Sequence, residues 1–241
     1  MHTRFPKGQQ GFFHKPYRRQ KEKIMISNYE KQVDIGKAYF LKYDQKVLAA
    51  KFRLNMDNNY LYLTYFNTPC RIERLSGTLF EKTTDSWTEC RSYETVMTIY
   101  DMLCHSTEST LPPLSGKWTP VANFAAAGAS PNAEIFSQKY ANAFSGKVDA
   151  VKKACISIGG ALKPVLAGAD ITAEIPVFSF FPVLFQFWES DDEFPPQIKI
   201  LWDDQTMRYL NFETTYYLQG DLLKRLQDTL LPQDQKANGA Q

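Results

Sequence analysis

The chain has 241 residues, of which 44% are hydrophobic and 22% are charged, a composition typical of a globular protein with a sizeable core. Its longest apolar run, residues 175–188, is shorter than the roughly 20 residues that a membrane-spanning helix needs. The first residues also lack the charged and then apolar order of a secretory signal. We therefore expect a cytoplasmic protein without a membrane span.

The cysteines and histidines do not have the spacing of a metal site. Neighbouring cysteines are at least fourteen residues apart, whereas zinc and iron–sulfur sites use closely spaced pairs. His105 follows a predicted helix, where a cation interacts favourably with the helix dipole. The sequence predicts buried free thiols and no metal, and it identifies no cofactor. The cysteines are Cys70, Cys90, Cys104 and Cys155.

The charge is unevenly distributed. Residues 1–23 contain seven basic residues and one acidic residue, and the remainder contains 21 basic and 25 acidic residues. We expect residues 1–25 to form a disordered tail, because they have no periodicity that would bury apolar surface. Such a tail offers electrostatic contact with nucleic acid or anionic lipid. The sequence has no recognisable nucleic-acid-binding module, so nucleic acid is not an expected partner.

In chain order, the first half predicts two short helices, a sheet and a longer helix. One helix ends near residue 41, and Asp44 is positioned to cap the second. Residues 59–81 alternate as expected for a small antiparallel meander, and residues 93–104 have the period of an amphipathic helix. Residues 111–117 are rich in Pro, Ser and Gly, which makes them the best place for any subdivision of the domain.

The second half predicts a short extended segment, two helices, a hairpin and a helical end. One helix begins at Ser130, and the next ends at Gly159–Gly160. Residues 171–188 are apolar on both faces, as in a strand inside a sheet. Residues 197–203 alternate and are expected to pair with them as a hairpin. One or two closing helices, broken near Gly220, precede a frayed end at 232–241.

These elements predict an α+β fold: an antiparallel sheet with a central apolar hairpin, packed by several helices in one domain over residues 26–231. The helices and strands come in runs, whereas a doubly wound fold would need strict alternation. No internal repeat is present.

The order of motifs after residue 117 resembles a bacterial and archaeal family catalogued as domain of unknown function 3786. The resemblance is carried by an aliphatic run ending in Trp188, an acidic stretch leading to Glu193-Phe194-Pro195, and a strand ending in Trp202-Asp203. Relatives in this family occur largely in anaerobes, and some have a four-cysteine iron–sulfur segment. That spacing is not found in this sequence. The resemblance implies a single cytoplasmic domain and no particular chemistry.

The expected hairpin loop, residues 189–197, is the candidate site. Crowded carboxylates raise one another's pKa or bind divalent cations, and we expect the hairpin to bring Asp203 and Asp204 close to the loop. No glycine-rich phosphate loop, HExxH or GxSxG motif accompanies them. The candidate binding residues are Trp188, Glu189, Asp191, Asp192, Glu193, Phe194, Trp202 and Asp203.

Three interpretations of the loop remain open. The first is a binding or accessory protein whose acidic and aromatic hairpin contacts a protein, small molecule or cation. The second is a metal-assisted hydrolase or lyase that uses the carboxylates of residues 189–193. The third is a solvated turn whose charges prevent the hairpin from pairing with other chains.

Aromatic residues suggest a further possibility. They make up 14% of the chain, and a pocket lined by them could hold a planar ligand such as a tetrapyrrole or a nucleotide. Core packing explains most of them, because burying each ring contributes a few kcal/mol without any ligand.

Overall fold

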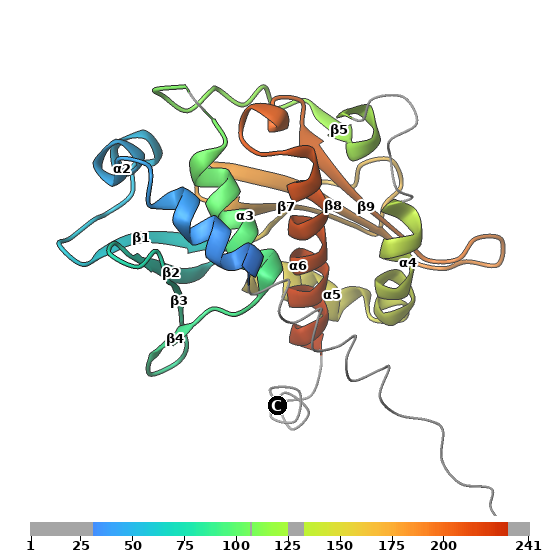
Figure 1. Ribbon diagram of the computed structural model, residues 1–241. Helices are drawn as coiled ribbons and strands as arrows, with labels where there is room; N and C mark the ends of the chain where they lie inside the picture. Colours follow the sequence, from blue (N-terminus) through green and yellow to red (C-terminus); the bar gives the residue numbers. More distant parts are fainter. Residues whose placement is uncertain (1–30, 107, 125–132, 231–241) are drawn as a thin grey trace, which may run out of the picture.

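The computed structural model describes residues 31–106, 108–124 and 133–230, and its fold is α+β with two antiparallel sheets (Figure 1). The predicted fold class is therefore confirmed. The predicted tail of residues 1–25, the helix start at Ser130 and the end at 232–241 lie outside the described residues. In that described part, we find no helix with the length and apolar character to cross a membrane.

The N-terminal half contains a four-stranded sheet and its helices. Residues 31–40 are helical, and the Asp44 carboxylate caps α2 by accepting from the amides of Lys46 and Val47. The strands pair in chain order, which confirms the predicted meander and adds a fourth strand. The elements are α2 (Gln45–Phe52), β1 (Tyr60–Tyr65), β2 (Thr68–Glu73), β3 (Leu79–Lys82), β4 (Trp87–Glu89) and α3 (Tyr93–Cys104).

The C-terminal half contains a five-stranded sheet with strand order β5-β9-β8-β7-β6. Strand β8 is central and therefore has a partner on each side, which explains its apolar residues on both faces. The elements are β5 (Trp118–Pro120), the 3-10 turn Val121–Phe124, α4 (Ala133–Phe144), α5 (Val148–Ser157), β6 (Ala161–Leu162), β7 (Ile171–Phe178), β8 (Phe181–Trp188), β9 (Gln197–Asp203), the 3-10 turn Thr206–Arg208 and α6 (Phe212–Leu230).

Helix α6 is continuous through Gly220, so the predicted break there is wrong. A glycine inside a helix costs only about 1 kcal/mol relative to alanine. Leu218, Leu222 and Leu226 of α6 are completely buried, and burying each contributes roughly 1.5–3 kcal/mol. The packing of these leucines therefore keeps the helix continuous, although glycine locally disfavours a helix.

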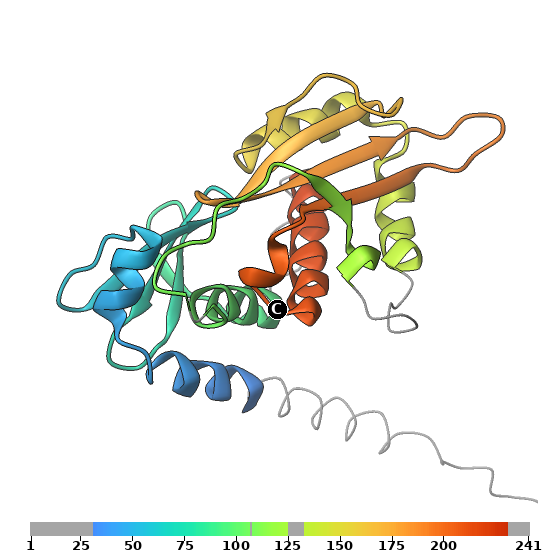
Figure 2. The same cartoon turned by 90° about the horizontal axis from the view of Figure 1, so that it is seen from above.

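One hydrophobic core joins the two halves. Its buried residues come from both sheets and from the helices. Helix α6 packs against α3, α4 and α5, and Figure 2 shows it near the centre of the molecule. The backbone of residues 115–116 is bonded to Asp203, and the Tyr209 hydroxyl donates to the carbonyl of Pro112. The proline-rich loop is thus fixed against the second sheet.

Candidate functional site

The predicted hairpin is present, and its tip protrudes beyond α4 in both views (Figures 1 and 2). Strands β8 and β9 pair antiparallel, with Trp188 opposite Gln197. The loop therefore comprises residues 189–196, and Gln197 belongs to the strand. This register brings Glu189, Asp191, Asp192, Glu193 and Phe194 together in one short loop.

Trp202 and Asp203 lie at the opposite end of β9, so the expectation that Asp203 and Asp204 join the loop carboxylates is wrong. In an antiparallel hairpin, residues after the first pair move away from the loop at about 3.4 Å per residue. The six steps from Gln197 to Asp203 correspond to about 20 Å. Trp202 is completely buried. Sequence proximity to an acidic loop therefore did not imply spatial proximity.

Asp203 holds loops together. Its carboxylate accepts hydrogen bonds from the backbone amides of Ser115 (3.2 Å), Gly116 (2.7 Å) and Gln205 (2.9 Å). The side chain is almost completely buried, and a buried carboxylate needs such donors. Its role is structural.

Two carboxylates of the loop are bonded to nearby backbone. Glu189 accepts from the amide of Gly146 (2.6 Å) and from the hydroxyl of Ser145, in the turn between α4 and α5. Burial acts to raise the pKa of Glu189, but these bonds together with the Ser190 amide outweigh it and lower that pKa. Asp191 accepts from the amides of Glu193 (2.9 Å) and Phe194 (2.7 Å). These two residues shape the loop.

The remaining loop residues point into solvent. Asp192 and Glu193 are exposed, and no hydrogen bond or ion pair within the described residues engages their side chains. Phe194 is 59% exposed, which is unusual for a phenylalanine. No set of three His, Cys, Asp or Glu in the described ranges is arranged to hold a metal ion. The tip is therefore a projecting surface.

Trp188 lies at the base of the loop on the face of β8. Its indole N–H donates to the carbonyl of Ala167 at 3.2 Å. The Lys199 ammonium lies 5.2 Å from the centre of its ring, within cation–π range. Trp188 therefore joins the loop to the sheet.

A second candidate site is a groove of about 1110 Å³ along α6. Helix α6 contributes Tyr216, Tyr217 and Gly220, and α4 contributes Phe136 and Tyr140. The other wall comes from the start of α3 and from residues 33–37 and 89–91. We call this the α6 groove. The sequence alone does not reveal it, because four separate segments have to meet before it exists.

Aromatic rings line both sides of the α6 groove. The rings of Tyr93 and Tyr217 meet edge to face with centres 5.3 Å apart. Across the groove, the rings of Phe136 and Tyr140 are 6.0 Å apart, and the Lys139 ammonium lies 4.6 Å from the centre of the Tyr140 ring. Phe136 is 40% exposed. A flat apolar molecule in the groove would contact these rings.

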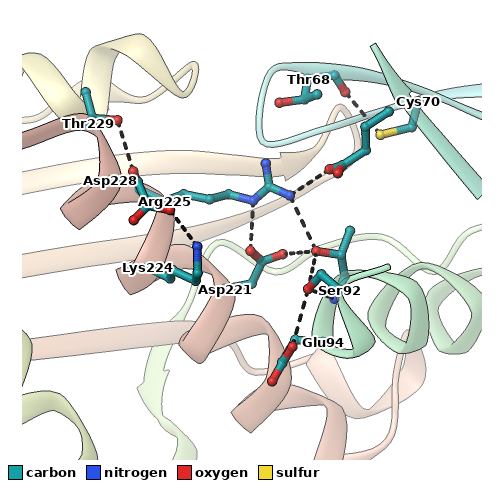
Figure 3. A network of polar contacts seen from close by, with 11 residues as sticks. Thr68, Cys70, Ser92, Glu94, Asp221, Lys224, Arg225, Asp228 and Thr229 are labelled. Atoms are coloured by element: carbon teal, nitrogen blue, oxygen red, sulfur yellow. Dashed lines mark hydrogen bonds and ion pairs between the residues drawn. The ribbon is translucent and has the colours of Figure 1, made fainter. Parts of the chain in front are cut away.

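A partly buried polar network fixes one wall of the groove (Figure 3). The Asp221 carboxylate accepts from the Thr95 hydroxyl (2.7 Å) and from Nε of Arg225 (2.9 Å). Arg225 also donates to Glu81 of β3 at 2.9 Å. Burial acts to lower the pKa of Arg225, but Asp221, Tyr65 and Glu81 raise it, so the guanidinium stays charged. The network links α6 to α3 and to the first sheet.

The reactive groups near the groove are poorly suited to catalysis. Cys90 borders it, and burial raises the pKa of this thiol far above its usual range, which leaves it neutral and weakly nucleophilic. Asp221 is already paired with Arg225. The Tyr216 hydroxyl is buried and has no hydrogen-bond partner among the residues described. The groove thus offers aromatic and polar contacts for binding.

One family matches most of the chain. It is described as Domain of unknown function (DUF3786), and the match covers residues 44–225. This range includes the β8–β9 hairpin and the first 14 of the 19 residues of α6. Neither a curated protein nor a solved structure matches the chain.

Proposed function

We propose that this chain, which belongs to the DUF3786 family, is a non-catalytic binding or accessory protein that holds a planar, anionic small molecule in the α6 groove. The observation that carries this proposal is that aromatic residues from three helices, Tyr93, Phe136 and Tyr217, line one concave volume. The proposal makes the groove the primary ligand site in place of the hairpin loop.

The size and lining of the groove support a planar ligand. Sites for small molecules usually have volumes of about 300–1000 Å³ and are mostly apolar and aromatic. At about 1110 Å³, the groove is large enough for a nucleotide or a tetrapyrrole. Each favourable ring-to-ring contact adds roughly 0.5–1.5 kcal/mol beyond the buried area.

Lys139 is the reason to expect a negatively charged ligand. Of the groove's cations, Lys37 lies 3.8 Å from Glu89 and Lys224 lies 2.6 Å from Asp228. The described residues include no carboxylate partner for Lys139, whose ammonium lies over two rings. A phosphate or carboxylate on a stacked ligand would pair with it and gain a charge-assisted hydrogen bond.

The alternative of a metal-assisted hydrolase or lyase at residues 189–193 has less support. Glu189 and Asp191 already accept backbone hydrogen bonds. Asp192 and Glu193 project from the loop, and no side chain of another element is bonded to them in the part of the chain that the structure describes. General acid–base chemistry needs such groups within hydrogen-bond reach of one substrate.

The hairpin tip is better suited to a second role, contact with a protein partner. Phe194 is exposed at the tip, beside the acidic side chains of Asp192 and Glu193. An exposed aromatic residue next to charges is typical of an interface anchor with a polar rim. A partner with a basic, partly apolar surface would complement it.

The proposal is tested by measuring binding of ATP, FMN and protoporphyrin IX by thermal shift and then by titration calorimetry. We expect at least one of them to raise the melting temperature. Phe136→Ala and Lys139→Ala should each weaken that binding, and Lys153→Ala, which removes an exposed lysine on α5, should not. If none of the three binds, or if the groove variants bind equally well, this function is wrong.

A further inference from the structure

The outer face of the first sheet carries a cluster of rings and cations that is separate from the α6 groove. The register pairs Tyr62 with Arg71 and Arg71 with Phe80, and directly opposed residues share a face. Lys82 and Trp87 are paired on the neighbouring strands. We call this set, together with Tyr60, the sheet platform.

The sheet platform lies opposite the core. Leu61, Ile72 and Leu79 alternate with the platform residues along the strands, and all three are buried. The platform rings and Arg71 are only partly buried. Their spacing therefore directs four aromatic side chains to the side of the sheet that faces away from the core.

Arg71 organises the platform. The centre of its guanidinium lies 4.0 Å from the Tyr60 ring, 4.4 Å from the Trp87 ring and 5.5 Å from the Phe80 ring. Its Nε is buried and makes no hydrogen bond within the described ranges. A guanidinium packed against these rings is a fixed positive charge within an aromatic surface, where it can attract an anion.

The platform's two cations, Arg71 and Lys82, are open to an anion, while the same face also carries Glu73 opposite Tyr60 and Glu89 opposite Phe80. Neither Arg71 nor Lys82 has a carboxylate within ion-pair distance in the described part of the chain. The nearby acids contact groups other than Arg71 and Lys82. Asp57 accepts from the Tyr62 hydroxyl, Glu73 accepts from the Ser76 hydroxyl, and Glu89 lies near Lys37 and Arg91.

We propose that the sheet platform binds single-stranded nucleic acid. Bases would stack on Tyr60, Phe80 and Trp87, and the phosphates would pair with Arg71 and Lys82. Single strands suit this surface because their unstacked bases present free ring faces, and four-stranded sheets with exposed aromatic residues bind them in this way. The seven basic residues among residues 1–23 add positive charge to the chain.

The proposal is tested with the full chain by fluorescence anisotropy, using labelled oligouridine and oligothymidine of about 12 nucleotides, within the usual range of site sizes. Trp87→Ala and Tyr60→Ala should each weaken binding by about fivefold or more, the loss expected for one stacked base. Lys82→Gln should reduce the slope of log affinity against log salt by roughly 0.7. Arg71→Lys should weaken binding, because it keeps the charge and loses the planar group.

Two controls make the result specific. The first is circular dichroism, which establishes that each variant is folded. The second is Tyr39→Ala, which removes an aromatic residue that is 47% exposed on the helix of residues 31–40. This change should not affect binding. Equal affinity for a duplex of the same length, or binding that is lost in Arg18→Gln/Arg19→Gln and unaffected in the platform variants, would overturn the proposal. Absence of binding at low salt would overturn it as well. Phe136→Ala in the α6 groove should have no effect, so this test is independent of the groove.

Discussion

The hairpin tip and the α6 groove are opposite kinds of surface. The tip is convex and acidic, and its residues come from one stretch of eight. The groove is concave and aromatic, and its residues come from four separate segments. Four carboxylates in sequence suggested chemistry at the tip, yet two of them bond to backbone and two face solvent. The difference shows that local charge density marks a surface loop, whereas a binding cavity depends on tertiary packing.

The largest expected effect comes from the network that holds the groove wall. Arg225→Met leaves the carboxylates of Asp221 and Glu81 without their cation. Because the side chains of Arg225 and Glu81 are 20% and 25% exposed, the cost is about 3 kcal/mol, the lower end of the range for a buried pair. We expect a loss of that size in the free energy of unfolding, measured by urea denaturation. Lys224→Met is the matched control, because Lys224 pairs with Asp228 on the exposed side of the same helix. Equal effects of the two changes would contradict the role given to the network.

The hairpin loop and the far end of β9 should respond differently to the same substitution. Asp203→Ala removes the acceptor for three backbone amides, and we expect it to lower the free energy of unfolding by about 2 kcal/mol or more. Asp192→Ala, at the tip, should change it by less than about 0.5 kcal/mol. Chemical denaturation of both variants provides the measurement. A larger loss for Asp192→Ala would mean that the tip is structural.

Glu189→Gln should have an intermediate, pH-dependent effect. We expect a loss of about 1 kcal/mol at neutral pH, since the weakened bonds to the α4–α5 turn are only partly shielded from water. The pKa of Glu189 is lower in the folded protein than in the unfolded chain. Its contribution is therefore complete above the unfolded pKa of about 4.3 and disappears as the pH falls through the folded value. Denaturation curves at several pH values should converge in acid, and a constant difference would contradict this account.

The smallest expected effect is an increase in the free energy of unfolding. Gly220→Ala places a methyl group 3.4 Å from the nearest atom of the Phe136 ring, an ordinary contact distance. Alanine favours the helix over glycine, so we expect a stabilisation of roughly 0.5–1 kcal/mol. Thermal unfolding of this variant tests whether the groove floor tolerates a side chain. A destabilised variant would show that α6 and α4 pack more tightly at this point.

The fold was largely predictable from the sequence because its signals are local. Alternating residues identified the meander of residues 59–81 and the hairpin at 188–197, and Asp44 identified a helix start. The continuity of α6 was not predictable, because long-range packing overrides the preference of Gly220. The distance between Asp203 and the loop followed from the predicted antiparallel pairing itself, because that pairing places the last residues of β9 farthest from the tip.

The groove was much less predictable. The two tyrosines of α6, Tyr216 and Tyr217, and the glycine three residues later were visible in the sequence. Nothing there indicated that Phe136 and Tyr93 would lie near them. Such proximity comes from α3, α4 and α6 packing together, which depends on the whole core.

The most direct test of the central claim compares ligand binding by two variants. Gly220→Leu fills the floor of the α6 groove, and Phe194→Ala removes the exposed ring of the hairpin tip. The ligand is whichever of ATP, FMN or protoporphyrin IX binds the wild type. Titration calorimetry should show at least a tenfold weaker affinity for Gly220→Leu, corresponding to about 1.4 kcal/mol. The affinity of Phe194→Ala should be unchanged. Unchanged binding by Gly220→Leu together with a loss for Phe194→Ala would place the ligand at the tip and contradict the account.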